Sequence, residues 1–271
     1  MKDKVVIVTG ASSGIGLAIA EHFAKKGCKV VFAARSFDKL QEITENLNLQ
    51  GCDTFPVKTN VTIEDSCKNL IDKTIEKYGK IDVLINNAGI SMRAVFNECE
   101  LKVLHELMDV NFWGTVNCTK FALPYIIETK GAIVGIISIA GYQPLPGRTG
   151  YSASKFAVRG FLDTIRIENK NNDVNVLVVA PGYVATDIRF RALLADGSQQ
   201  GYSPRDEKKM QSTQWVAKRI YNAVKHKRRS IIMTTLGFVT VFVRNLWPKF
   251  TDRESYKIMN REQNSPLIKK N

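Results

Sequence analysis

The chain has 271 residues, of which 44% are hydrophobic, 9% aromatic and 24% charged, and this composition excludes disordered, collagen-like and miniprotein chains. The net charge of +13 is uneven: residues 1–202 hold 23 Lys and Arg against 21 Asp and Glu, whereas residues 203–271 hold 16 against 5. The body is therefore nearly neutral, and only the C-terminal part favours an anionic surface.

The five cysteines are odd in number and include no C-x-x-C pair. This usage predicts free thiols in a reducing compartment, with neither a disulfide framework nor a zinc site. After Met1-Lys2-Asp3-Lys4 only four apolar residues follow, too few for the core of a signal peptide. No run of 18 apolar residues occurs, so we expect no membrane-spanning helix. Together these features predict a cytoplasmic protein, in contact with a membrane at its surface at most.

Short β-branched runs alternate with longer helical patterns along the first 235 residues. The predicted strands are 5–9, 29–34, 54–57, 81–86, 132–138, 174–180 and 230–233, and the predicted helices are 14–26, 37–48, 63–78, 98–128 (two helices), 151–169 and 213–226. Continuous Val/Ile strands are buried on both faces, and crossovers of this length join parallel strands. We therefore expect an α/β fold, in which one doubly wound Rossmann-type domain (1–235) contains a seven-stranded parallel sheet with helices on both faces. The polar stretch 188–212 is expected to be a flexible loop near the site.

The first predicted strand leads directly into the turn Thr9-Gly10-Ala11-Ser12-Ser13-Gly14-Ile15-Gly16, and an amphipathic helix follows. Glycines permit positive φ and a close approach of the backbone to a ligand. The free N–H groups and the positive dipole end of the helix then favour a pyrophosphate. The spacing G-x-x-x-G-x-G differs from the usual G-x-G-x-x-G, and no Gly-Lys-Ser/Thr of a P-loop follows. Taken alone, such a turn can also be a simple strand–helix connection.

The second predicted strand ends at Ala33-Ala34-Arg35-Ser36. A site for NAD places an acid here, where it binds the ribose 2′-hydroxyl. Arg35 instead offers a guanidinium that can pair bidentately with a 2′-phosphate. The sequence therefore favours NADP(H) as the cofactor, with NAD(H) as the alternative.

Tyr151 and Lys155 are four residues apart on a predicted helix, so both side chains lie on one face. A nearby cation favours the phenolate and lowers the pKa of a tyrosine from its ordinary value of about 10. Such a tyrosine exchanges a proton with an alcohol–carbonyl couple while a hydride moves at carbon. Ser138, at the end of a predicted central strand, can donate to the developing oxyanion. A lone Tyr-x-x-x-Lys is usually an exposed helix face, but the combination with Ser138 and the glycine turn predicts a catalytic site.

With these motifs in this order, residues 3–235 resemble the short-chain dehydrogenase/reductase family. The further matching motifs are Asn86-Asn87-Ala88-Gly89, Asn111 in Val-Asn-Phe-Trp-Gly, and Pro181-Gly182-Tyr183-Val184-Ala185-Thr186. The resemblance implies that Tyr151 is the catalytic acid/base and that Ser138 positions the substrate oxygen. It also implies that Lys155 holds the nicotinamide ribose and that Asn111 keeps a water in a proton relay to Lys155.

The same resemblance assigns the cofactor site. The residues expected to line it are Gly10, Ser12, Ser13, Gly14, Ile15, Gly16, Arg35, Asn60, Val61, Asn87, Ala88, Gly89, Tyr151, Lys155, Pro181, Val184 and Thr186. Two positions depart from the family pattern. Asn60 replaces the acid that usually contacts adenine, although its amide can still hydrogen-bond the base. Ser13 stands where some NADP-dependent members carry a basic residue. Together the two departures leave NAD(H) open as the alternative.

Residues 236–271 form a basic extension that begins with the apolar, aromatic stretch 236–250. Lys227, Arg228 and Arg229 precede this stretch, and further cations lie at or after its end. An apolar helix with basic flanks is typical of peripheral membrane contact. The tail resembles that of membrane-associated family members related to 11β-hydroxysteroid dehydrogenase and to dehydrogenase/reductase member 7B, which act on steroid-like or other lipophilic carbonyls. The alternative is that the tail packs on its own domain or on a dimer partner. No nucleic-acid-binding motif accompanies the basic residues, so we expect no nucleic acid.

The sequence thus predicts an NADP(H)-dependent oxidoreductase that transfers a hydride between nicotinamide and a lipophilic carbonyl or secondary alcohol, without a metal. The alternative is a non-catalytic NADPH-binding regulatory or membrane-associated scaffold, although a scaffold does not need Asn111, Ser138, Tyr151 and Lys155 together. The resemblance implies a homodimer or tetramer formed through the helices predicted at 98–128 and 151–169. We expect residues 91–98 and 188–212 to line the substrate pocket.

Overall fold

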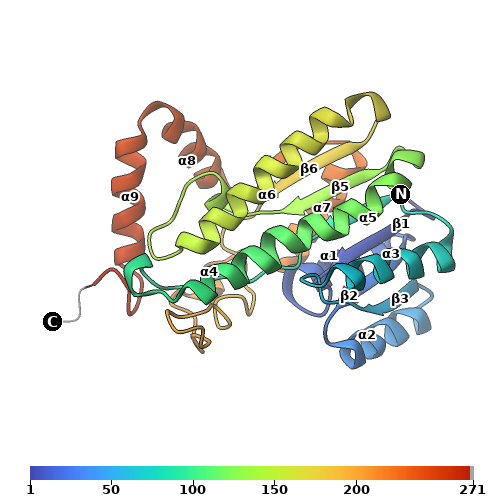
Figure 1. Ribbon diagram of the computed structural model, residues 1–271, viewed down its shortest axis with the longest axis horizontal. Helices are drawn as coiled ribbons and strands as arrows, with labels where there is room; N and C mark the ends of the chain where they lie inside the picture. The colour runs from blue at the N-terminus through green and yellow to red at the C-terminus, as the bar shows by residue number, and fades with distance from the viewer. Residues whose placement is uncertain (269–271) are drawn as a thin grey trace.

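The computed structural model describes residues 1–268, and within them seven strands form one parallel sheet with helices on both faces (Figure 1). The strands are β1 (Val5–Thr9), β2 (Lys29–Ala34), β3 (Asp53–Lys58), β4 (Val83–Asn86), β5 (Ala132–Ile136), β6 (Asn175–Ala180) and β7 (Ser230–Ile232). They lie in the order β3-β2-β1-β4-β5-β6-β7, and every neighbouring pair is parallel. The predicted doubly wound α/β fold is therefore confirmed.

Helices cover the two faces of the sheet in two sets. The helices are α1 (Gly14–Lys25), α2 (Phe37–Leu49), α3 (Glu64–Tyr78), α4 (Leu101–Leu107), α5 (Gly114–Glu128), α6 (Thr149–Glu168), α7 (Thr213–Lys225), α8 (Thr235–Leu246) and α9 (Pro248–Asn260). Apolar side chains of α1, α2 and α7 pack on one face, and those of α3, α5 and α6 pack on the other. Because the central strands are covered on both sides, all five residues of β1 are buried, as its unbroken Val/Ile sequence predicts.

The predicted boundaries differ from the observed ones by a few residues in most elements. The strand predicted at 132–138 ends at Ile136, so Ser138 lies in the turn beyond β5. The helix predicted from 151 begins at Thr149, which places Tyr151 in the first turn of α6. The two helices predicted within 98–128 are joined by a π-helical segment, η2 (Met108–Trp113). A π-helical turn holds one extra residue, so a search for the 3.6-residue period does not detect it.

The strand order reverses between β1 and β4, and this reversal positions the site. In open α/β sheets, ligands bind at the carboxyl ends of the strands beside such a switch point. Because all strands are parallel, the turn after β1, the loop after β4, Ser138 after β5 and Pro181 after β6 meet at one edge of the sheet. The fold thereby gathers motifs that are far apart in the sequence.

The predicted apolar tail helix is two helices, α8 and α9, joined at Trp247. They lie together at one end of the molecule, beside the start of α6 (Figure 1). Residues Thr251, Ser255 and Met259 of α9 are buried, whereas most apolar side chains of α8 are exposed. Within residues 1–268, none of the helices has the length and apolar content needed to cross a membrane.

Candidate active site

The glycine turn after β1 requires glycine for two separate reasons. Gly10 and Gly14 have φ angles of +65° and +57°, in the left-handed region that other residues rarely adopt. At Gly16, a Cβ atom would collide with Asn87 Nδ2 and with the carbonyl oxygen of Gly10. The N-terminal turn of α1 is therefore pressed against the backbone that precedes it.

Hydrogen bonds fix this turn to the loop that follows β4. The side-chain amide of Asn87 donates to the carbonyl oxygen of Thr9 over 2.9 Å. In return, Thr9 Oγ1 accepts from the backbone N–H groups of Asn87 and Ala88, each at 3.0 Å. Sequence analysis named Asn87 and Ala88 but gave no role to Thr9. Its position as the last residue of the first strand is the signal that would have pointed to it.

The N-terminus of α1 is suited to an anionic ligand. Ser13 is the N-cap residue, in an extended conformation, and its side chain makes no capping hydrogen bond. Because no side chain caps the first turn there, its N–H groups and the helix dipole are available to a pyrophosphate. The turn opens on a cavity of about 740 Å³.

All seventeen residues predicted for the cofactor site lie on the wall of this one cavity, and so does Ser138. Arg35 is exposed just after β2 and lines the cavity, so its guanidinium can reach a ligand bound there. Asn60 follows β3, and its side-chain oxygen accepts from the N–H and the hydroxyl of Thr62, at 3.3 and 3.0 Å. This turn holds Asn60 at the cavity wall.

Ser138 and Tyr151 form the polar centre of the cavity. Ser138 Oγ accepts from the N–H of Ala140 at 3.2 Å, so its hydroxyl hydrogen can be donated to a ligand. Burial raises the pKa of Tyr151. Three other groups act against this rise, because the Ser138 hydroxyl and the positive charges of Arg148 and Arg189 each lower the pKa of Tyr151. Burial has the larger effect, so the pKa of Tyr151 lies above its ordinary value, opposite to the lowering expected from a neighbouring cation.

Lys155 lies one turn beyond Tyr151 on α6 and is buried. Its ammonium donates to the carbonyl oxygen of Ile136 over 3.0 Å and lies 5.8 Å from the centre of the Tyr151 ring. Burial lowers the pKa of Lys155 to about 8. Lys155 is therefore a buried amine held beside the Tyr151 ring.

Asn111 lies behind the cavity wall, in the π-helical segment η2, and is fully buried. Its amide oxygen accepts from the N–H of Ile90 at 2.8 Å, and its Nδ2 donates to Ile90 O and to Ser154 Oγ. A Cβ at Gly89 would lie 3.0 Å from Asn111 Oδ1 and 3.3 Å from Lys155 Nζ. The side chains of Asn111 and Lys155 therefore both lie close to Gly89.

Besides Ile139, Gln143, Leu145 and Arg148 between β5 and α6, three further segments line the other end of the cavity, and only the first two of them were expected from the sequence. The segment 91–98 contributes Ser91, and 188–212 contributes Ile188, Arg189, Arg191, Arg205, Lys209 and Gln211. The third is the tail, which contributes Leu236, Gly237, Thr240, Ser255, Ile258, Met259 and Glu262. No motif in the sequence marks the tail as a pocket wall. Glu262, the last of the three acids in the tail, is the nearest thing to a signal.

Glu262 fixes the tail to the body of the protein. One carboxylate oxygen accepts from Arg205 Nε at 2.7 Å, and the other accepts from Arg148 Nη2 at 3.1 Å and lies 3.5 Å from Arg93 Nε. A second link joins Gln143 to Ser255 Oγ over 3.1 Å. The sequence left open whether the tail contacts a membrane or packs on its own domain. Helix α9 packs on its own domain, because its residues form part of the cavity wall.

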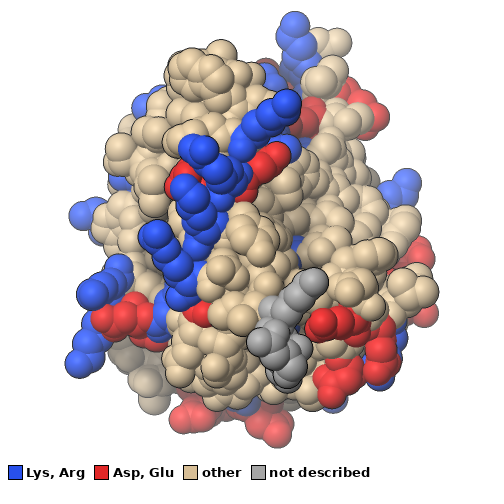
Figure 2. All heavy atoms as spheres, turned by 90° about the vertical axis from the view of Figure 1, so that its left-hand side faces the viewer, with Lys and Arg blue, Asp and Glu red and all other residues tan. Residues whose placement is uncertain are grey.

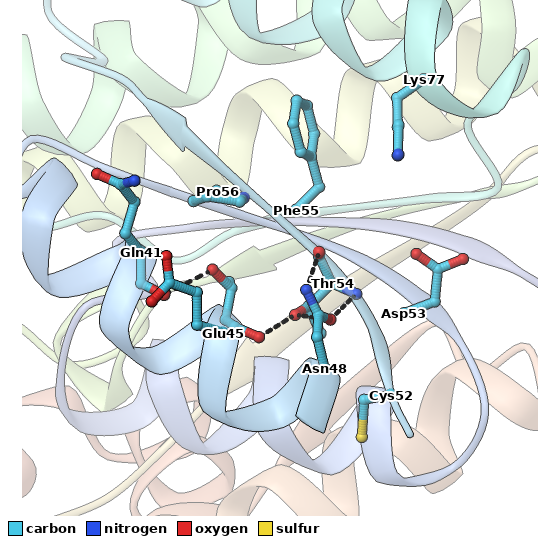
Figure 3. A pocket seen from close by; sticks show the side chains of 10 residues that line it. Gln41, Glu45, Asn48, Cys52, Asp53, Thr54, Phe55, Pro56 and Lys77 are labelled. Carbon is cyan, nitrogen blue, oxygen red and sulfur yellow. Dashed lines mark hydrogen bonds between the residues drawn. The ribbon is translucent and has the colours of Figure 1, made fainter. Parts of the chain in front are cut away.

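A second hollow lies between α2 and β3, far from these residues (Figure 3). Its polar groups bond to one another: Thr54 Oγ1 donates to Asn48 Oδ1 over 2.7 Å, and Asn48 Nδ2 donates to the carbonyl oxygen of Thr54. These bonds join the end of α2 to the edge strand. The hollow is thus a structural contact between two elements.

The chain is similar to known proteins in both sequence and structure. The short chain dehydrogenase family model matches residues 4–194. The chain is 34% identical to dehydrogenase/reductase SDR family member 7B of Rattus norvegicus, over 98% of this chain and 84% of that protein. It is 41% identical to 11-beta-hydroxysteroid dehydrogenase-like 3 of Arabidopsis thaliana, over 68% of this chain and 60% of that protein. An alcohol dehydrogenase of the archaeon Thermococcus sibiricus, solved with 5-hydroxy-NADP, superposes with a TM-score of 0.77 at 28% identity, covering 86% of this chain and 96% of that one.

Proposed function

Because the chain belongs to the short-chain dehydrogenase/reductase family, we propose that it is an NADP(H)-dependent oxidoreductase for a lipophilic carbonyl or secondary alcohol. Members of this family interconvert alcohols and carbonyls with NAD(P). The observation that carries the proposal is that Ser138, Tyr151 and Lys155 share one cavity with a glycine turn built for a pyrophosphate.

The residues of the cavity fit a nicotinamide dinucleotide. The first turn of α1 would hold the pyrophosphate, because no side chain caps its N–H groups and Gly14 and Gly16 line the cavity there. Arg35 would bind the 2′-phosphate, and Lys155 would hold the nicotinamide ribose. When bound, the nicotinamide supplies or accepts the hydride.

The positions of Ser138, Tyr151 and Lys155 indicate how the proton is transferred to or from the substrate oxygen. A carbonyl oxygen between Ser138 and Tyr151 receives a hydrogen bond from the Ser138 hydroxyl, which stabilises negative charge as it develops. In the reduction, Tyr151 donates its proton to that oxygen, and the charge of Lys155 stabilises the phenolate that forms. In the oxidation, the phenolate of Tyr151 removes the proton from the alcohol.

The lipophilic character of the substrate is supported by the walls beyond Tyr151. Apolar side chains line them, namely Ile139, Leu145, Ile188, Leu236, Ile258 and Met259. An apolar wall with a few directed polar groups is typical of a small-molecule site. A lipophilic substrate would bury its body against these side chains and place its oxygen at Ser138.

Tyr151→Phe tests the proposed chemistry. We expect NADPH oxidation on a panel of steroid, retinoid, fatty-acyl and small aromatic carbonyls to fall at least a thousandfold in kcat, because the proton donor is lost, with NADPH affinity within threefold of wild type. Tyr125→Phe, on α5 and away from the cavity, is the matched control and should retain turnover. Turnover retained by Tyr151→Phe would contradict the assignment. NADPH binding by the wild type with no turnover on any carbonyl would favour the scaffold alternative.

A peripheral membrane contact through α8 is also part of the proposal. The exposed face of α8 carries the apolar side chains Leu236, Phe238, Val239, Phe242 and Leu246. Monomeric proteins rarely expose a contiguous apolar patch of this kind without a partner. Arg244, Lys249 and Arg253 are close by in the chain, and Figure 2 shows basic side chains in a band across the end of the molecule that carries α9. An apolar surface beside cations is suited to anionic lipid headgroups.

Co-sedimentation with vesicles of phosphatidylserine and phosphatidylcholine tests this contact. Phe242→Asp should reduce the bound fraction at least fivefold, because it adds an acid to the centre of the apolar face. Leu49→Asp makes the same kind of change at an exposed position on α2 and should bind as wild type does. Equal binding by the two variants would refute the membrane contact. Deletion of all residues after Met233 would be a poorer test, since it also removes the cavity wall and Glu262.

We further propose that the protein is a homodimer or tetramer through α4, α5 and α6. Exposed apolar side chains on or beside these helices support such an interface. They are Leu101 at the start of α4, Trp113 just before α5 and Ile167 near the end of α6. Sedimentation velocity at micromolar concentration measures the assembly directly. A monomer across that range would refute it.

A further inference from the structure

The substrate end of the cavity holds more positive than negative charge. Arg148 and Arg205 line this end, and within residues 1–268 they share one carboxylate, Glu262, with Arg93, which is buried behind the cavity wall and does not line it. Arg189 and Arg191, which also line the cavity, each have an acid of their own: Glu207 at 2.7 Å and Asp187 at 3.2 Å. The excess charge is therefore located at the Glu262 cluster.

This cluster is largely withdrawn from water. The side chains of Arg93 and Glu262 are 2% and 4% exposed, and those of Arg148 and Arg205 are 11% and 23% exposed. Three guanidinium groups and one carboxylate carry a net charge of +2. Unbalanced charge is costly where solvent is scarce, and an anion placed beside the arginines offsets that cost.

Arg205 is oriented to bind an oxyanion. Its guanidinium lies 4.0 Å from the centre of the Tyr183 ring, and its Nε is bonded to Glu262. The other contact of its fork is Nη2 to Met259 Sδ at 3.9 Å, and a thioether is a weak acceptor. A guanidinium fixed in this way can offer its N–H groups to two oxygens of one group.

Arg148 connects the cluster to the reacting atoms. It is the N-cap residue of α6, three positions before Tyr151, and both residues line the cavity. The positive charge of Arg148 opposes the rise that burial causes in the pKa of Tyr151. Apolar residues of the tail, Leu236, Ile258 and Met259, line the same end of the cavity.

We propose that Arg148 and Arg205 bind an anionic head group, a carboxylate or a phosphate monoester, on an otherwise apolar substrate. The apolar body contacts the tail residues, and the carbonyl reaches Ser138 and Tyr151. This specificity rests on the proposed oxidoreductase function, but binding of the head group does not require turnover. Glu262 holds the two arginines in place and leaves the cluster with enough positive charge for a second anion.

Isothermal titration of the NADP⁺-loaded full chain with three probes of equal chain length tests the proposal. The probes are dodecanoate, dodecyl phosphate and dodecanol, all used below their aggregation concentrations. We expect at least one anion to bind tenfold or more tightly than dodecanol. Preference for both anions assigns the site to anionic head groups in general, and preference for one alone identifies that head group. Equal binding of all three probes would overturn the proposal.

Two arginine variants then locate the preference. Arg205→Gln should reduce it to threefold or less, whereas Arg205→Lys should keep part of it, because the charge remains and the fork is lost. Arg253→Gln removes one positive charge from an exposed position on α9 and should keep the full preference. Loss in Arg253→Gln with retention in Arg205→Gln would place the anion on the tail surface and overturn the proposal.

Tyr151→Phe separates this inference from the proposed function. The variant should lose turnover and keep the anion preference, because Tyr151 does not contact the head group. A wild type that turns over carbonyl substrates and shows no anion preference would refute the anion site alone. A wild type with the preference and no turnover would refute the proposed reaction alone.

Discussion

The two ends of the cavity are built in different ways. The cofactor end consists of turns at the carboxyl ends of strands, where backbone meets backbone: Gly16 lies against the carbonyl of Gly10, and Asn87 bonds the backbone of Thr9. The substrate end is assembled from loops and the tail, and side-chain ion pairs to Glu262 hold it together. Backbone contacts tolerate almost no substitution, whereas side-chain pairs can be exchanged. The first end is therefore suited to a ligand common to a family, and the second to a ligand of one protein.

The largest effect we expect is at the substrate end. Glu262→Gln leaves the buried Arg93 and the partly buried Arg148 and Arg205 without their shared carboxylate, and removal of one partner from a buried ion pair costs about 3–5 kcal/mol. Hydrogen exchange of the α9 amides should lose protection by a comparable amount. Glu254→Gln removes a half-buried carboxylate whose partners Arg253 and Lys257 are exposed on the same helix, and as the control it should leave the protection unchanged. Unchanged exchange in both variants would mean that ion pairs do not hold this end.

At the cofactor end, Gly16→Ala should lower the affinity for NADPH at least a hundredfold, about 2.7 kcal/mol. The added methyl group collides with Asn87 and with Gly10, so the turn that receives the pyrophosphate has to open. Gly160→Ala makes the same change on α6, where a Cβ meets no atom within 4 Å, and should bind NADPH as wild type does. Fluorescence titration measures both affinities. Similar affinities in the two variants would contradict the backbone argument.

Lys155 lies between the two ends and predicts a pH dependence. Its pKa is about 8 in the folded chain and 10.5 without burial, so between these values the unfolded chain holds a proton that the folded chain has released. The free energy of unfolding therefore rises with pH over this range, by on the order of 2 kcal/mol from pH 7.5 to pH 10.

Urea unfolding of the cofactor-free protein at these two pH values isolates the contribution of Lys155. Lys155→Met should lack this part of the rise, because it removes the titrating group. Lys120→Met, exposed on α5, should show the full rise. If Lys155→Met gains stability with pH as much as wild type does, Lys155 does not titrate in this range.

The smallest expected effect concerns the choice of cofactor. We expect NADPH to bind at least tenfold more tightly than NADH, about 1.4 kcal/mol, and Arg35→Asp to reverse that order by repelling the 2′-phosphate. Lys39→Asp changes the charge equally on neighbouring α2 and should keep the NADPH preference. Competition titrations with the two cofactors measure the ratio. Persistence of the NADPH preference in Arg35→Asp would show that another group binds the phosphate.

The same contrast governs what the sequence could predict. The strands, the α/β fold and the family followed from Val/Ile runs and from motifs at strand ends, and the structure and the comparisons confirm them. All predicted cofactor residues lie on one cavity because parallel strands end at one edge. The π-helical segment that carries Asn111 and the role of Thr9 were missed. Neither leaves a periodic pattern in the sequence. The π-helical segment adds a single residue to a turn, and the role of Thr9 depends on its hydrogen bonds to a loop that is distant in the sequence.

The amino-acid sequence by itself identified the turns that line the proposed cofactor end of the cavity. Positive φ and close backbone approach restrict positions such as Gly10 and Gly14 to glycine, so local physics leaves a readable pattern. Only the tertiary structure decided that the tail closes the cavity and that Glu262 meets arginines from three other segments. Charges so distant in sequence leave no local pattern, because their pairing depends on how the folded segments meet in space.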